Sequence, residues 1–132
     1  MFYYIASLAL SLFVAFIFWG ASKNKLTKSM DDLAAAGLGW VKDTSASVVR
    51  FIGVLELAGA AGVLLAPFAY FVLGFDWAKG LGVAAAAGLG LTMIVAAIMH
   101  TVRKEIKYTW KLNFGFAALA IVDAVLIALI TR

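Results

Sequence analysis

The chain has 132 residues, of which 65% are hydrophobic and only 14% are charged, and its formal net charge is +4. Soluble domains are about 45–50% apolar and about 25% charged, so lipid is expected to surround most of this chain. With no cysteine and one histidine, it cannot form a disulfide framework, a thiolate metal or iron–sulfur site, or a bis-histidine haem site within one chain. The basic residues cluster between hydrophobic runs, which is typical of membrane proteins and does not indicate nucleic-acid binding.

Four apolar runs, each close to the roughly 20 residues that one helical span needs, predict four membrane-spanning helices. They cover about residues 1–20, 48–73, 80–100 and 112–131. Because the connections are short, we expect an all-α membrane protein in which a four-transmembrane-helix bundle is the single domain, over residues 1–132. Ser7, Ser11 and Ala15 recur at four-residue spacing in the first run, which predicts a small-residue surface for close helix packing.

The first connection, residues 21–47, is expected to contain an interfacial segment. Ser29 is placed to cap a short helix that has two aspartates in its first turn. Apolar side chains such as Leu33 and Trp40 would rest this segment on the membrane surface. Gly37 and the glycine two residues later are expected to end it.

The distribution of basic residues predicts the orientation in the membrane. In a four-span chain the first and third connections share one side, and the other side carries only Lys79 and Arg132. Positive charges stay in the cytoplasm, so we expect a plasma (inner) membrane protein with both termini outside the cytoplasm. The first and third connections hold nine basic residues: Lys23, Lys25, Lys28, Lys42, Arg50, Arg103, Lys104, Lys107 and Lys111.

The second span carries a carboxylate, Glu56, about 9 Å along the helix axis from Arg50. An ionisable group within a span is costly and is treated as a functional-site hypothesis. Two interpretations stay open: Glu56 forms a structural ion pair with a basic residue such as Lys25, or it serves a ligand or a proton. Arg50 is expected to reach the phosphate headgroups.

Polar residues of the third and fourth spans lie at related depths. His100 ends the third span and Asn113 begins the fourth, while Asp123 lies about 15 Å beyond Asn113 and about 80° around the helix. We therefore expect Glu56, His100, Asn113 and Asp123 to line one cavity open to the cytoplasmic side. Alternatively, His100 caps its helix at the interface, and a protonated Asp123 donates a hydrogen bond to a neighbouring helix.

Three short motifs occur in the order found in a known family. They are GASKNKL after the first span, IGVLELAGAAGVLLAP over residues 52–67, and LTMIVAAIMHTVRKE over residues 91–105. Together they resemble the DoxX-like family of small membrane proteins. The resemblance implies that Lys25, Glu56, His100 and Glu105 are the polar positions of the family. It also implies that Arg103 stands between His100 and Glu105 in the expected order. The family is named for a small subunit of an archaeal thiosulfate:quinone oxidoreductase, and other members resemble membrane parts of redox or detoxification assemblies.

The polar cluster and this resemblance together suggest a small accessory subunit of a quinone-linked or other membrane redox assembly. The expected ligand is a quinone or a lipid held in the bundle, with no covalent cofactor and no metal. Glu56 and His100 would be its proton or hydrogen-bond partners. A supporting polar network is expected from Lys25, Arg50, Arg103 and Glu105. The expected partners are the lipid bilayer and other membrane subunits or a second copy, without nucleic acid.

Two alternatives remain at this point. The chain could be a proton-coupled small-molecule transporter that uses Glu56, or a structural scaffold or assembly subunit of a larger membrane complex. An enzyme that acts on its own is the least supported class, because the sequence offers no nucleophile–base pair, no metal cluster and no glycine-rich phosphate loop.

Overall fold

The computed structural model describes all 132 residues and contains helices but no strands. Four long helices are each long and apolar enough to cross a membrane, which confirms the expected all-α membrane bundle. A short helix and a 3₁₀ helix lie in the first connection. The bounds are α1 (Phe2–Thr27), α2 (Met30–Ala35), η1 (Gly39–Asp43), α3 (Ala46–Phe71), α4 (Asp76–Val102) and α5 (Ile106–Ala128).

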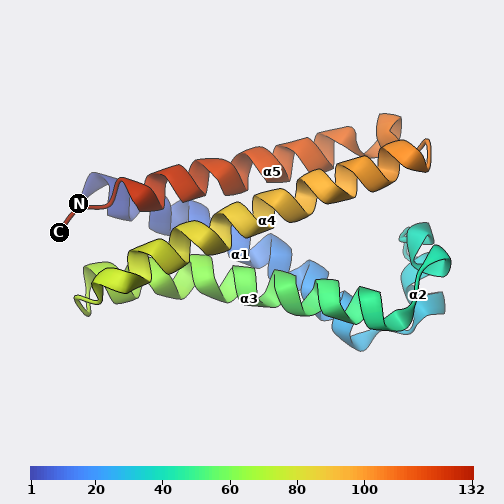
Figure 1. The fold of residues 1–132 in the computed structure, drawn as a ribbon, viewed down its shortest axis with the longest axis horizontal. Helices are drawn as coiled ribbons and strands as arrows, with labels where there is room; N and C mark the ends of the chain where they lie inside the picture. Colours follow the sequence, from blue (N-terminus) through green and yellow to red (C-terminus); the bar gives the residue numbers. More distant parts are fainter.

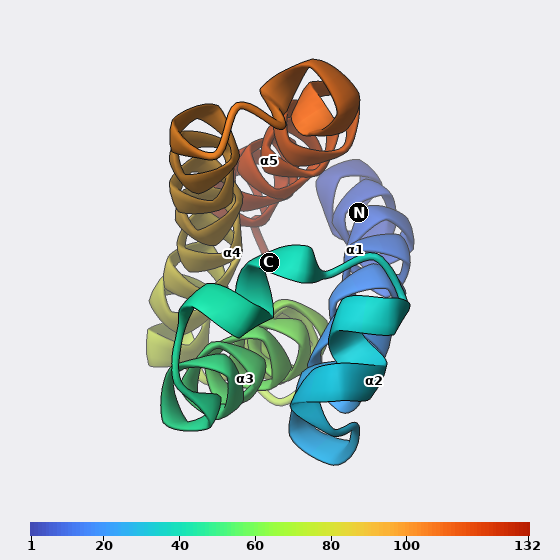
Figure 2. The same ribbon diagram turned by 90° about the vertical axis from the view of Figure 1, so that its right-hand side faces the viewer.

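The long helices pack in a ring in the order α1, α3, α4, α5, and α5 returns to α1 (Figure 2). Both termini and the α3–α4 connection lie at one end of the molecule, which we call the terminal end (Figure 1). Helix α2, η1 and the α4–α5 connection lie at the other end, called the α2 end. Helices α3 and α4 lie close together near the terminal end and diverge toward the α2 end.

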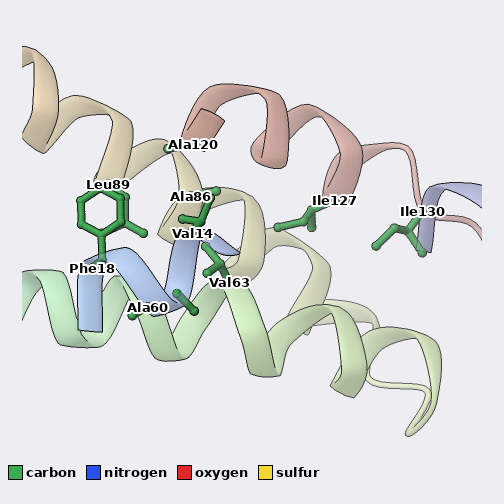
Figure 3. Packing of buried hydrophobic residues seen from close by; sticks show 10 residues of the cluster. Val14, Phe18, Ala60, Val63, Ala86, Leu89, Ala120, Ile127 and Ile130 are labelled. Atoms are coloured by element: carbon green, nitrogen blue, oxygen red, sulfur yellow. The ribbon is translucent and has the colours of Figure 1, made fainter. Parts of the chain in front are cut away.

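Small and branched side chains form the bundle core, as Figure 3 shows around Val63 and Leu89. A Cβ atom at Gly59 would lie 2.5 Å from Leu89 Cδ2, and one at Gly62 would lie 2.6 Å from Ala85 Cβ. These two glycines therefore allow the close approach of α3 and α4. Contact of this kind holds membrane helices together, because lipid is as apolar as a leucine side chain and gives little hydrophobic drive for their association.

Helix α1 continues about two turns beyond the first predicted span, which ended near residue 20. Its last turns carry polar residues that have contacts within the protein. Lys25 is buried, and the Lys23 ammonium lies 5.3 Å from the centre of the Trp19 ring. The length of the apolar run therefore underestimates the length of α1, because Lys23 and Lys25 find partners within the protein.

The first connection folds over the α2 end in the way the capping signals predict. The Ser29 hydroxyl accepts a hydrogen bond from the backbone N–H of Asp32 at 3.1 Å. After α2 the chain turns at Gly37, whose φ of +101° favours glycine. A small second core then holds α2 and η1 against the start of α3, made by Leu33, Val41 and Val49. The expectation that Leu33 rests on the membrane surface is therefore wrong, because its side chain is fully buried in this core. The placement of the segment as a whole at a membrane interface stays a prediction.

Candidate functional site

A cavity of about 430 Å³ lies toward the α2 end of the bundle, where α3 and α4 diverge. All four long helices contribute to its wall, and Leu38 and Trp40 of the first connection also line it. We call this space the polar cavity. Most of its lining is apolar, and its polar side chains are those of Lys25, Glu56, Thr92, His100 and Asn113.

Lys25 of α1 and Glu56 of α3 form a buried ion pair at the wall of this cavity. The Lys25 ammonium donates to both carboxylate oxygens, at 3.1 Å and 3.0 Å, and the two side chains are 10% and 2% exposed. The structure thus forms the pair that was one of the two open interpretations of Glu56. An ammonium has three N–H donors, so one donor of Lys25 remains without a protein partner.

Arg50 makes contacts within the protein that its place at the start of the span did not indicate, while its contact with lipid headgroups stays a prediction. Its guanidinium donates to the backbone carbonyl of Lys25 and, at 2.7 Å, to that of Lys28. The last carbonyls of a helix have no intrahelical donor, so an arginine from α3 satisfies them here. This contact holds the end of α1 against α3 and thereby positions Lys25 beside Glu56.

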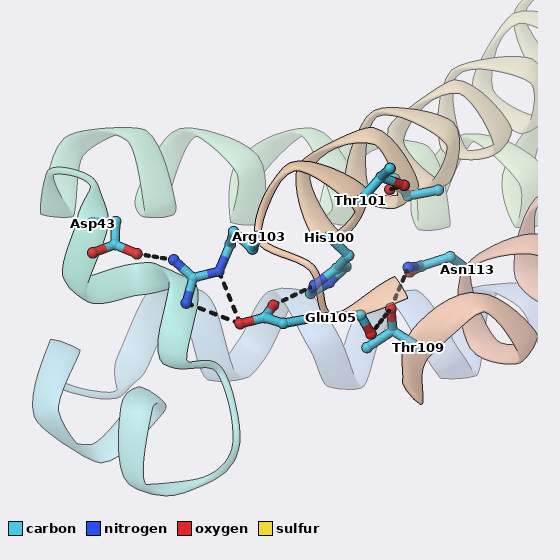
Figure 4. Close-up of polar contacts among 8 residues, drawn as sticks. Asp43, His100, Thr101, Arg103, Glu105, Thr109 and Asn113 are labelled. Carbon is cyan, nitrogen blue, oxygen red and sulfur yellow. Dashed lines mark hydrogen bonds and ion pairs between the residues drawn. The ribbon is translucent and has the colours of Figure 1, made fainter. Parts of the chain in front are cut away.

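A chain of polar contacts runs from η1 to His100, which lines the cavity (Figure 4). His100 Nδ1 lies 2.9 Å from Glu105 Oε2, and Arg103 Nε donates to Glu105 Oε1 at 3.0 Å. Arg103 also forms an ion pair with Asp43 of η1. The α4–α5 connection is therefore tied to the segment that carries Leu38 and Trp40 over the cavity.

The same contacts set the electrostatics of the connection. Hydrogen bonds from the Arg103 guanidinium and from the His100 imidazole hold the pKa of the Glu105 carboxyl below its ordinary value. Because Nδ1 of His100 faces this carboxylate, its other ring nitrogen, Nε2, is left without a protein partner. An imidazole oriented in this way can exchange a hydrogen bond or a proton with a bound molecule.

Asn113 of α5 also lines the cavity and is 7% exposed. Its amide nitrogen donates to the Thr109 hydroxyl at 3.4 Å, a long bond that leaves hydrogen-bonding capacity on the amide. The structure therefore brings three of the four expected pocket residues, Glu56, His100 and Asn113, to one cavity. Their role in ligand binding stays a prediction.

The expectation that Asp123 lines this cavity is corrected by the structure. Asp123 is fully buried between α5 and α1, where the Ser11 hydroxyl lies 3.0 Å and 2.8 Å from its two oxygens. Ser7 lies 3.5 Å from one of them. The offset of about 80° and about 15 Å from Asn113 turns Asp123 toward α1 instead of into the cavity.

The two serines thus do more than provide a small packing surface. A sequence signal was present, because hydroxyl groups four residues apart lie on one face of a helix. That face of α1 offers two hydroxyl donors, at Ser7 and Ser11. Helix α5 carries one intramembrane acid, Asp123, which needs hydrogen-bond donors. Matching the donors of one span to the unpaired acid of another would have found this contact.

The four apolar helices, with polar side chains gathered in a cavity between them, define a small multi-pass integral membrane protein. The model of the DoxX-like family matches residues 9–123, so the chain belongs to this family. Comparisons with curated proteins and with solved structures give no match.

Proposed function

We propose that this chain is a small accessory subunit of a quinone-linked membrane redox assembly, and that the polar cavity binds the quinone headgroup. The observation that carries the proposal is the gathering of the Lys25–Glu56 pair, His100 and Asn113 in one largely apolar cavity. A quinone ring is flat and apolar, and it has two carbonyl oxygens that accept hydrogen bonds. The free donor of Lys25 and the amide of Asn113 are suited to those oxygens.

Reduction of a bound quinone adds an electron pair and one proton at each carbonyl oxygen. In this proposal the electrons come from a redox centre of a partner subunit. His100 delivers protons, because its imidazole lies between the cavity and Glu105. The Glu105 side chain is 35% exposed and can exchange protons with water. The chain therefore supplies the binding site and the proton route, and its partner supplies the electrons.

The ion pair favours binding over transport as the function of the cavity. A proton-coupled transporter must load and release a proton at its carboxylate in every cycle. Glu56 instead accepts two hydrogen bonds from Lys25 in a site that is almost closed to water. Breaking such a pair leaves a buried charge without a partner, which is costly.

The test of the proposal is quinone binding to the purified protein in nanodiscs. Trp40 lines the cavity, so a variant that keeps it as the sole tryptophan reports binding by fluorescence quenching. Glu56→Gln is expected to weaken the binding of a tailless benzoquinone by about tenfold or more, because the carboxylate that holds the Lys25 ammonium beside the cavity is lost, and a hydrogen bond from a charged donor contributes about 1.5–3 kcal/mol. The matched control is Asp123→Asn, which changes an equally buried carboxylate away from the cavity and should leave the affinity unchanged.

A result without quinone binding, together with normal quinone-linked respiration in cells that carry Glu56→Gln, would overturn the proposal. Proton-coupled substrate flux in vesicles that Glu56→Gln abolishes would instead identify a transporter. A stoichiometric partner that copurifies equally well with wild type and Glu56→Gln, without quinone binding, would identify a scaffold.

We also propose that the α2 end faces the cytoplasm of the plasma membrane and that both termini lie outside. The clustering of basic residues at the α2 end supports this orientation. Lys28 and Lys107 are exposed at that end, and Leu73 is exposed at the other. In intact cells an impermeant thiol reagent should label Leu73→Cys and should label Lys28→Cys and Lys107→Cys only after permeabilisation. The reverse pattern would invert the proposed topology.

A further inference from the structure

A second hollow, of about 750 Å³, runs along the outer face of α3 and α4. Small residues such as Ala58, Gly62, Ala85 and Gly88 line it. Large apolar side chains that are 53–67% exposed also line it, namely Leu65, Trp77 and Leu81. We call this hollow the α3–α4 groove.

The groove adjoins the polar cavity. Leu55, Leu91 and Thr92 line both spaces, so the two are neighbours at this point. The Thr92 hydroxyl donates to the Gly88 carbonyl at 2.9 Å, which leaves no unpaired donor at the junction. An apolar chain can therefore lie across the junction without leaving that hydroxyl unsatisfied.

The dimensions of the groove match a long hydrocarbon tail. It extends from Leu55 to Ala69 on α3 and from Trp77 to Thr92 on α4. At the helical rise these stretches are about 21 Å and about 22 Å long. One leaflet of a bilayer has a hydrocarbon thickness of about 15 Å, half of the usual core. The walls of the groove would thus contact a tail over more than the hydrocarbon thickness of one leaflet.

We propose that the α3–α4 groove binds the isoprenoid tail of the quinone whose head occupies the polar cavity, and that this molecule enters from the bilayer between α3 and α4. This inference rests on the proposed function. The aqueous side offers a poorer entrance, because Leu38 and Trp40 of the first connection line that side.

The charge of the cavity favours a quinone over a phospholipid as the occupant. Lys25 is the only lysine or arginine in the cavity lining, and Glu56 neutralises it at hydrogen-bond distance. No net positive charge is therefore available there for a phosphate group, whose transfer into an apolar site is costly. A neutral ring with carbonyl oxygens needs only hydrogen-bond donors.

The groove binds the tail through packing contact, because the tail leaves a lipid environment that is as apolar as the groove itself. Such contact is sensitive to shape, so a side chain that fills the groove should displace the tail. Gly88 is suited to this test, since a Cβ atom there would meet nothing within 4 Å. Gly115 of α5 is the matched control, because it is also exposed with free space and lines neither the groove nor the cavity.

The experiment compares a tailless benzoquinone with the same ring bearing a polyprenyl tail, by the Trp40 signal in nanodiscs, with affinities expressed per lipid. Gly88→Leu is expected to weaken the tailed quinone by about tenfold, or about 1.4 kcal/mol, and to leave the tailless quinone unchanged. Gly115→Leu should change neither. Ala61→Leu fills the groove from α3 and should repeat the effect, which covers the case that Gly88→Leu folds poorly.

Different outcomes separate this inference from the proposed function. If both quinones bind to wild type and Gly88→Leu alike, the tail site is wrong and headgroup binding stands. An equal loss for both quinones would place the effect in the cavity itself and would also overturn the tail site. Loss of a copurified phospholipid from Gly88→Leu, with unchanged binding of the tailed quinone, would assign the groove to lipid. If wild type binds neither quinone, both proposals fail.

Discussion

Removing either partner of the Lys25–Glu56 pair should destabilise the fold much more than removing both. The pair is 10% and 2% exposed and forms two charge-assisted hydrogen bonds. Loss of one partner of a buried pair costs about 3–5 kcal/mol, because the other charge is left uncompensated. Replacement of both by apolar residues of similar volume is often near neutral. We expect about 3 kcal/mol for Lys25→Met or Glu56→Met, since the unfolded chain in a membrane also finds partners.

A double-mutant cycle measures this coupling. The two single variants and Lys25→Met/Glu56→Met are unfolded reversibly in mixed detergent micelles, and helix content is followed by circular dichroism. The double variant should lose less free energy of unfolding than the more affected single variant. Asp43→Asn serves as a control, because it breaks an ion pair in which Asp43 is 67% exposed and which is worth about 0–1 kcal/mol. Losses that simply add in the double variant would refute the reasoning.

Three further predictions concern contacts outside this pair. Ser11→Ala should lower the free energy of unfolding by about 1–3 kcal/mol, because it removes the short hydrogen bond that the Ser11 hydroxyl gives to the buried acid of α5. Ser7→Ala removes one 3.5 Å contact and should cost less. Equal losses in the same unfolding assay would contradict the geometry. Gly59→Ala should destabilise the bundle by about 1–3 kcal/mol, because its methyl group clashes with Leu89 of α4. Gly88→Ala should be neutral or stabilising. Thermal melts that compare the two variants with wild type test both expectations. The pKa of Glu105 is held below its ordinary value of 4.5, so its contribution is complete above that pH and is lost as the pH falls through the lowered pKa. The difference in melting temperature between wild type and Glu105→Gln should therefore be present at neutral pH and disappear in acid, and a difference that persists would assign the contact to packing.

The four spans could be predicted from the sequence because backbone groups in lipid must be satisfied within one helix, and this requires long apolar runs. The Lys25–Glu56 pair was also accessible in advance, as one of two interpretations. An acid within a span needs a partner, and few cations lie near enough. These inferences depend on local chemistry and length, which a single sequence carries.

Contacts between helices could not be predicted from the sequence in the same way. Asp123 faces α1 instead of the cavity because an offset of about 80° is enough to turn a side chain to a different neighbour. Arg50 caps α1 because the two helix ends meet, which neither helix reveals alone. The polar cavity and the α3–α4 groove likewise depend on where α3 and α4 diverge, and that angle follows from close contacts such as that of Gly59 with Leu89.

Photochemical cross-linking tests quinone binding in the polar cavity most directly. A photoreactive tailless quinone is irradiated with the protein in nanodiscs, and the modified peptides are mapped by mass spectrometry, with and without an excess of unreactive quinone. We predict protected labelling of cavity residues, with Trp40, Met93 and Met99 as reporters. Labelling that the excess does not suppress, or that falls on lipid-facing residues such as Phe16 and Leu129 instead, would contradict it.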